Sequence, residues 1–367
     1  MIASRYLGLL AFLLASVLSS AFGSPLSNAL PPGYLNPTLY KNTVTSRGLT
    51  YQYYHVPPSN SSKPTLLLCH GYPSFSQDWR RAAPLFEARG YRVLAVDMLG
   101  YHGTARPLDP KKYLMSAVAR DLVDVVDAEK LTNVVAIGHD WGSLAVSRLS
   151  NYFPERFLAY AFLAVQFLPP EVPANFSAVL AAQQAQYGYE LYGYWLFYAE
   201  HDANAIIQAH MDSYVSIIYP SDPIFWKERM APAGALKKNL LADFRAPRPS
   251  YISAVEVEYF KAYYRANGFS APDGWYTIQT TNLQAFDDQQ IPADRAYPPV
   301  TKPIFYGGVS KDYIARTDAA LEIFNGPGFA GHNVTLKEYD SDHWVLISHA
   351  EDLVRDLDAW LEDAGIV

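Results

Sequence analysis

The residues with the clearest capacity for chemistry lie between positions 133 and 143, where the chain reads Asn-Val-Val-Ala-Ile-Gly-His-Asp-Trp-Gly-Ser. Gly138 and Gly142 permit a turn from strand to helix so tight that larger side chains would clash, which predicts a nucleophile elbow that exposes Asp140. A carboxylate can attack carbon directly and form an alkyl-enzyme ester. The stretch therefore predicts displacement at an electrophilic sp3 carbon; the alternative is that Asp140 only caps the following helix.

Alternating strands and helices are expected around this turn. Besides the run before Asp140, the predicted strands span residues 49–55, 64–69, 91–97, 157–167, 303–308 and 334–339. Helices are predicted after Asp140 and over residues 77–88, 114–129 and 351–364. Strands that alternate with helices predict a parallel sheet with right-handed crossovers.

One segment interrupts this alternation. Residues 168–296 contain helical patches, proline breaks and a cluster of tyrosines, without a clear strand run. We interpret them as a helical cap between two parts of the core, residues 24–167 and 297–367, with residues 24–47 as an arm over the surface. A ligand pocket is then expected between cap and sheet, at the carboxyl ends of the strands.

The N-terminus predicts a secretory signal peptide over residues 1–23, because one positive charge precedes a short apolar run and a small-residue segment. The apolar run, residues 6–18, is shorter than the roughly 20 residues that span a bilayer. An uncleaved membrane anchor is the alternative. Sequons at Asn60, Asn175 and Asn333 are compatible with secretion and predict exposed, glycosylated positions.

Composition excludes several other classes of function. Half of the 367 residues are hydrophobic, which is ample for a buried core. Without Arg5 of the predicted signal peptide, 28 basic and 36 acidic residues remain, and no basic cluster indicates nucleic acid. The single cysteine, Cys69, is expected in a buried strand. Histidine spacing supports no metal site, and Gly326 to Gly331 follows a predicted helix instead of a strand, so we expect no cofactor.

Three motifs together are more specific than any one of them. His-Gly-Tyr-Pro at residues 70–73, the turn at residues 97–103 and the elbow resemble the epoxide hydrolase branch of the α/β-hydrolase superfamily, from about residue 49 onward. The resemblance implies an α/β-hydrolase fold, a mostly parallel twisted sheet flanked by helices, with an inserted helical cap. It also implies an oxyanion hole formed by the main-chain N–H groups of Tyr72 and Trp141, and a cis bond between Tyr72 and Pro73.

The triad order of this fold is nucleophile, acid, histidine. After Asp140, the matching candidates are Asp312 and His343, each just after a predicted strand, where Asp312 would orient the imidazole that removes a proton from water. His349 is the nearest rival and suits packing or capping better. The family often has Gly before the histidine, whereas this chain has Asp342, a carboxylate that would raise the pKa of His343.

Opening an epoxide requires a hydrogen bond to its oxygen, and phenol hydroxyls of a cap suit that task. Tyr276, in a Trp-Tyr pair preceded by Gly-Phe, resembles one of the family's two cap tyrosines, and Tyr194 resembles the other. Tyr189 is a plausible substitute for Tyr194.

The predicted function is an epoxide hydrolase that converts a small apolar epoxide and water to a vicinal diol through an ester on Asp140. The alternatives are a haloalkane or haloacid dehalogenase with the same nucleophile, and a non-catalytic binding protein of the same fold. The predicted substrate pocket is apolar and includes Phe75, Trp141, Trp195 and Phe197. We expect no stable membrane span; the sequence specifies neither the epoxide nor the oligomeric state.

Overall fold

The computed structural model describes residues 33–56 and 63–367, in which eight strands form one sheet. The strands occur in the spatial order β1-β2-β4-β3-β5-β6-β7-β8. They are β1 (Tyr40–Val44), β2 (Thr50–Val56), β3 (Thr65–Cys69), β4 (Arg92–Val96), β5 (Val134–His139), β6 (Ala159–Leu163), β7 (Ile304–Val309) and β8 (Val334–Tyr339). Pairing is antiparallel from β1 to β2 and from β2 to β4, and parallel across the rest of the sheet.

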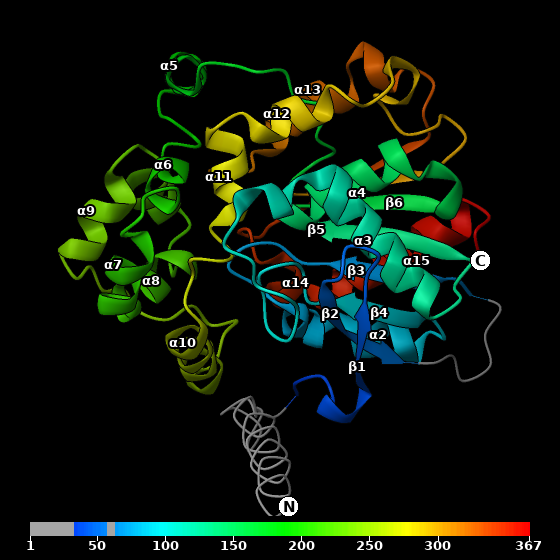
Figure 1. Cartoon of the computed structure of the whole chain (residues 1–367), viewed down its shortest axis with the longest axis horizontal. Helices are drawn as coiled ribbons and strands as arrows, with labels where there is room; N and C mark the ends of the chain where they lie inside the picture. The colour runs from blue at the N-terminus through cyan, green and yellow to red at the C-terminus, as the bar shows by residue number, and fades with distance from the viewer. Residues whose placement is uncertain (1–32, 57–62) are drawn as a thin grey trace, which may run out of the picture.

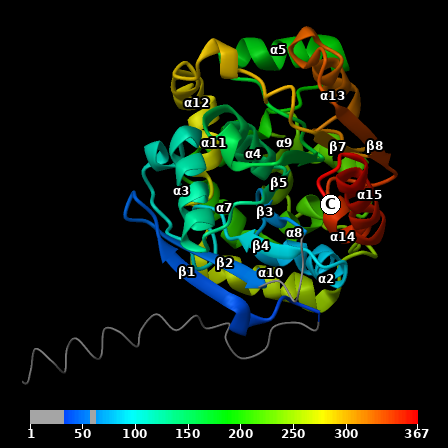
Figure 2. The same cartoon turned by 90° about the vertical axis from the view of Figure 1, so that its right-hand side faces the viewer.

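Helices cover both faces of this sheet (Figure 2). One face carries α2 (Ala82–Ala88), α14 (Val345–Ser348) and α15 (Ala350–Asp363), and the other carries α3 (Met115–Ala128) and α4 (Trp141–Tyr152). A further core helix, α13 (Thr317–Phe324), lies between β7 and β8 in the chain. The predicted α/β-hydrolase fold is confirmed.

The central strands are apolar because both of their faces are covered. Every residue of β3, β5 and β6 is buried, including Cys69 as expected. The parallel register sets Cys69 beside Gly138 and Gly138 beside Phe162. The loops that leave the carboxyl ends of these strands therefore emerge at one edge of the sheet.

The segment between β6 and β7 is helical, and Figure 1 shows much of it standing to the left of the sheet. Its helices are α5 (Phe176–Tyr187), α6 (Tyr194–Tyr198), α7 (Ala203–Ala209), α8 (Met211–Ile218), α9 (Ala235–Leu241), α10 (Ala254–Asn267), α11 (Gly274–Thr280) and α12 (Leu283–Asp288). All of them fall within the predicted cap, whose bounds at residues 168 and 296 stay a prediction. Among the described residues, none of the helices combines the length and apolar character needed to cross a membrane.

The surface arm predicted over residues 24–47 is wrong in part, because residues 40–44 form β1. Tyr40 pairs with Tyr54 and Val44 with Thr50, so β1 extends the sheet as an edge strand. None of the five residues of β1 is fully buried. This explains why residues 40–44 lack the apolar alternation typical of a strand.

Two predicted elements are shorter than expected. The strand predicted over residues 157–167 ends at Leu163, because Ala164 has a φ of 59° and leaves the extended conformation. The helix predicted over residues 77–88 is divided into a 3-10 turn, Ser76–Arg80, and α2. Pro84 lacks a main-chain N–H group, so it is accommodated in the first turn of a new helix better than inside a continuous one.

Candidate active site

Asp140 occupies a sharp turn between β5 and α4. Its backbone has a φ of 55° and a ψ of −128°, in a region that non-glycine residues rarely occupy. A Cβ atom at Gly138 would lie 2.4 Å from the carbonyl oxygen of Gly142, and one at Gly142 would lie 2.1 Å from that of Cys69. Only glycine fits at both positions, so the turn has the geometry expected of a nucleophile elbow.

Main-chain donors hold the Asp140 carboxylate. The N–H of Tyr72 donates to Asp140 Oδ1 at 2.8 Å, and the N–H of Trp141 also hydrogen-bonds to the carboxylate. The Tyr72–Pro73 bond is cis, as expected. A Cβ atom at Gly71 would lie 2.1 Å from Oδ1, so glycine at this position permits the close approach.

The other oxygen of Asp140 faces a histidine. His343 Nε2 lies 3.5 Å from Asp140 Oδ2, and Nδ1 of the same ring lies 2.6 Å from Asp312 Oδ2. Asp312 Oδ1 accepts the main-chain N–H groups of Ile314 at 2.8 Å and Ala315 at 2.9 Å. The loops after β5, β7 and β8 thus bring the three predicted triad residues together in the predicted order.

Burial and charge act in opposite directions on this buried pair. Burial raises the pKa of Asp140 above its usual range, while His343 and the N–H groups of Tyr72 and Trp141 limit the rise. Burial lowers the pKa of His343, but three carboxylates outweigh burial, so the pKa is raised overall. In order of decreasing effect, they are those of Asp312, Asp140 and Asp342. Asp342 raises that pKa as expected, although its own carboxylate accepts from Tyr251 Oη at 2.7 Å.

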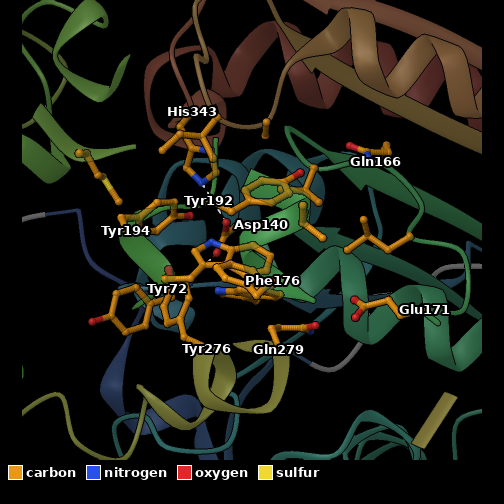
Figure 3. A pocket seen from close by; sticks show the side chains of 18 of the residues that line it. Tyr72, Asp140, Gln166, Glu171, Phe176, Tyr192, Tyr194, Tyr276, Gln279 and His343 are labelled. Carbon is orange, nitrogen blue, oxygen red and sulfur yellow. Dashed lines mark hydrogen bonds and ion pairs between the residues drawn. The ribbon is translucent and has the colours of Figure 1, made fainter. Parts of the chain in front are cut away.

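Two phenols from the cap line the same cavity as Asp140. Tyr194 begins α6, Tyr276 lies in α11, and their ring centroids are 5.7 Å apart (Figure 3). Burial raises the pKa of both phenols well above the usual range, so both stay protonated. Tyr189, in contrast, donates to the carbonyl oxygen of Tyr313 at 2.6 Å and does not line this cavity, which favours Tyr194 over Tyr189.

The cavity between cap and sheet has a volume of about 450 Å³. Most of its walls are apolar, and they include Trp141, Leu168, Val179, Trp195 and Met230. Two of the predicted pocket residues, Trp141 and Trp195, are therefore present, with ring centroids 5.1 Å apart.

The prediction that Phe75 and Phe197 line the pocket is wrong. Phe75 packs against His102 and Tyr263, with ring centroids 6.0 and 5.2 Å away, because the chain has already turned from the site after Pro73. Phe197 lies three residues beyond Tyr194 and is only 2% exposed within the cap. Both are ordinary core residues.

His349, the alternative to His343, lies away from the cavity. His349 precedes α15, and its Nδ1 lies 2.9 Å from Ser348 Oγ. It does not line the cavity. His349 therefore occupies the packing or capping position expected for it.

The structure brings further residues to the site whose place there the sequence analysis did not predict. His139 Nε2 lies 2.8 Å from the carbonyl oxygen of His343, and the two rings are 4.6 Å apart. The walls of the cavity include Tyr192, Glu171 and Gln279, whereas His139 is buried behind His343 and does not line it. His139 belongs to the elbow motif, but its contact with His343, 204 residues away in the sequence, depends on tertiary structure; the other three residues belong to no motif.

The remaining predictions concern the surface and the N-terminus. Asn175 and Asn333 are both exposed, and Asn175 caps α5 by accepting from the N–H of Ala178. The predicted signal peptide and Asn60 lie outside the described residues.

Known proteins resemble this chain in sequence and fold. It is 26% identical to bifunctional epoxide hydrolase 2 of Sus scrofa over 338 residues. The aligned region covers 91% of this chain and 57% of that protein. Epoxide hydrolase A of Mycobacterium tuberculosis is 28% identical over 274 residues, 72% of this chain and 81% of that protein. The chain spans about half the length of the mammalian curated relatives it matches.

A solved structure and a family model extend this comparison. The crystal structure of epoxide hydrolase A from Mycobacterium thermoresistibile matches with a TM-score of 0.68 at 22% identity, over 88% of this chain and 98% of that chain, which shows a shared fold. The family model described as alpha/beta hydrolase fold matches residues 64–298. The chain therefore belongs to the α/β-hydrolase fold family.

Proposed function

We propose that the chain is an epoxide hydrolase acting through an ester on Asp140. The observation that carries this proposal is the position of the Asp140 carboxylate, with Oδ1 held by the Tyr72 N–H and Oδ2 beside His343, in a cavity also lined by Tyr194 and Tyr276. The names of the relatives in pig and Mycobacterium tuberculosis support the same activity.

Ring opening is the first half of the reaction. Asp140 Oδ2 forms a bond to one ring carbon, the bond from that carbon to the epoxide oxygen breaks, and a phenol of Tyr194 or Tyr276 gives its proton to the released oxygen. A β-hydroxyalkyl ester and a tyrosinate result. Since the phenols are fixed before the substrate arrives, they stabilise the developing charge without reorganisation.

Ester hydrolysis is the second half. His343 takes a proton from water, and the hydroxide adds to the carbonyl carbon of the ester, whose oxyanion the N–H groups of Tyr72 and Trp141 hold. The intermediate collapses, the diol leaves with the proton of the new carboxyl group, and Asp140 is again a carboxylate. The proton on His343 then returns to the tyrosinate, so epoxide and water give diol.

A panel of apolar epoxides and haloalkanes tests the reaction class. Diol formation from epoxides, lost in Asp140→Asn, is the expected result. Halide release without diol would indicate the dehalogenase alternative, and the absence of turnover on both panels would indicate a binding protein. Asp340→Asn is a matched control, because the Asp340 side chain is 79% exposed and pairs with Lys311 on the surface.

We also propose that the protein is secreted and glycosylated, with the mature chain beginning near Ser24. The charge and apolar pattern of residues 1–23 and the exposed sequons Asn175 and Asn333 support this proposal. Intact mass before and after glycan removal tests it. An unprocessed N-terminus would favour the membrane-anchored alternative, and a mass without glycan would exclude use of Asn60, Asn175 and Asn333 in that host.

A further inference from the structure

The cavity has one ionisable carboxyl group that the proposed reaction does not use. Glu171 lines the cavity from the loop that follows β6. Figure 3 shows its carboxylate well separated from Asp140, on the side opposite Tyr194. An otherwise largely apolar pocket therefore has a polar end.

Gln279 supplies the second polar group at this end. One end of the Gln279 amide lies 2.8 and 2.9 Å from the two carboxylate oxygens of Glu171. Because only acceptors surround this end, we assign the amide nitrogen to it, and in that orientation Gln279 donates to both oxygens. Gln279 lies three residues after Tyr276 in α11, so the two side chains share one face of the helix about one turn apart. A substrate whose epoxide oxygen contacts Tyr276 can thus extend toward Glu171 along α11.

The neighbouring charges leave this polar end acidic. The guanidinium of Arg148, on α4, pairs with Asp288 at the end of α12, and Asp288 Oδ2 also accepts the main-chain N–H of Glu171 at 2.9 Å. Arg148 donates further to the carbonyl oxygen of Leu168 at 2.6 Å. Because Arg148 is already matched by Asp288, ionised Glu171 gives the group a net charge of −1.

We propose that Glu171 and Gln279 form a subsite that binds a hydrogen-bond donor, a hydroxyl or an ammonium group, at the end of the substrate remote from the epoxide. This inference rests on the proposed epoxide hydrolase function. It changes the expected substrate from a wholly apolar epoxide to one with a polar tail, and it disfavours epoxides that end in a carboxylate.

The protonation of Glu171 gives the subsite a pH dependence. Burial raises the pKa of Glu171 to about 7; Arg148 opposes the rise and Asp288 adds to it. As the pH rises through about 7, Glu171 becomes ionised. The kcat/KM for ammonium-tailed substrates should then rise, and the kcat/KM for carboxylate-tailed substrates should fall. The ratio of kcat/KM for two such substrates isolates this effect, because the titrations of Asp140 and His343 are common to both.

Epoxides of equal chain length that end in methyl, hydroxyl, ammonium or carboxylate groups test the subsite. In the wild-type protein, we expect kcat/KM relative to the methyl substrate to be raised for hydroxyl and ammonium tails and lowered for carboxylate. Glu171→Gln should reduce the ammonium preference, expressed as kcat/KM relative to the methyl substrate in the same variant, about 10-fold or more, the scale of one charge-assisted hydrogen bond. Glu338→Gln, at an exposed position of β8, is the matched control.

The outcomes separate this inference from the proposed function. Turnover of all four epoxides with the same relative kcat/KM in the wild type and Glu171→Gln would overturn the subsite and leave the enzyme class intact. A uniform loss on all four, with a lower melting temperature, would assign Glu171 a purely structural role. If no epoxide is turned over, quenching of Trp141 and Trp195 fluorescence by amines and alcohols without an epoxide still tests the subsite, and equal affinity in both proteins would reject it.

Discussion

Replacing Asp312 with asparagine should slow hydrolysis of the ester and leave ring opening nearly unchanged. In the native site, Asp312 Oδ1 accepts from the N–H groups of Ile314 and Ala315, and Oδ2 lies 2.6 Å from His343 Nδ1. The asparagine oxygen is expected to keep the two main-chain donors, so its NH2 group would face Nδ1. His343 would then carry its hydrogen on Nε2, where it cannot take a proton from water.

The magnitude follows from the hydrogen bond that is lost. A hydrogen bond to a charged group contributes about 1.5–3 kcal/mol, which corresponds to about 10- to 150-fold in the rate of hydrolysis. The wrong tautomer adds to this loss, up to the roughly 10²–10⁴-fold of a positioned general base. The ester on Asp140 should therefore accumulate in the Asp312→Asn variant.

The pH dependence of the variant has a definite sign. His343 is a base only when neutral, so hydrolysis falls as the pH drops below its pKa. Burial lowers that pKa, and Asp312 is the largest of the influences that raise it. Removing the carboxylate should therefore lower the pKa of His343 and move the acid limb of the hydrolysis rate to lower pH.

Single-turnover fluorescence should separate the two steps, since Trp141 and Trp195 line the cavity with Asp140 and their emission is expected to change when the ester forms and when it is hydrolysed. Asp340→Asn is the control for a change of one surface carboxylate. Equal slowing of ring opening and hydrolysis in Asp312→Asn, or an acid limb that stays in place, would refute the role of Asp312 as the residue that orients His343.

Two further predictions concern the cap. Tyr194→Phe and Tyr276→Phe should each slow ring opening by about 10²-fold, on the scale of one lost oxyanion donor. The double variant should nearly abolish ring opening. In the same stopped-flow assay, Tyr189→Phe should open the ring at a rate close to that of the wild type. Loss of activity in Tyr189→Phe alone would move the donor role to that residue. Glu256 pairs with Arg80. Burial raises the pKa of Glu256, but Arg80 and Ser253 outweigh burial and lower this pKa to about 2. The ionised form of Glu256 therefore stabilises the fold above about pH 4.5, and this contribution is lost as the pH falls through 2. In urea unfolding, Glu256→Gln should therefore be less stable than wild type at pH 7, with the difference shrinking toward pH 2; a constant difference would contradict the pairing.

The sequence predicts the parts of the site that depend on local geometry. The glycines around Asp140 have no alternative that fits, and Asp312 and His343 follow apolar strands whose carboxyl ends share one sheet edge. Such constraints are visible in a single sequence because residue type and spacing express them directly. Of the eight described strands, β1 is the one that the sequence does not predict, since an edge strand without a buried residue has no apolar alternation.

The direction in which a cap side chain points is not encoded in this way. Phe197 is as aromatic as Trp195, yet only Trp195 lines the cavity, because packing of the cap decides which face each residue presents. Glu171 and Gln279 are distant in sequence and belong to no motif. Their proximity results from the approach of α11 to the loop after β6, which periodicity does not predict.

The central claim is that Asp140 is the nucleophile, and isotope labelling tests it most directly. One turnover by excess enzyme in heavy-oxygen water should place the label in Asp140 and leave the first diol unlabelled, since the diol oxygen comes from the carboxylate and water only replaces it. His343→Gln should then retain a mass adduct on the peptide that contains Asp140, because the ester forms but is hydrolysed slowly. Label in the first diol, with no adduct in His343→Gln, would contradict the account and leave Asp140 at most a general base.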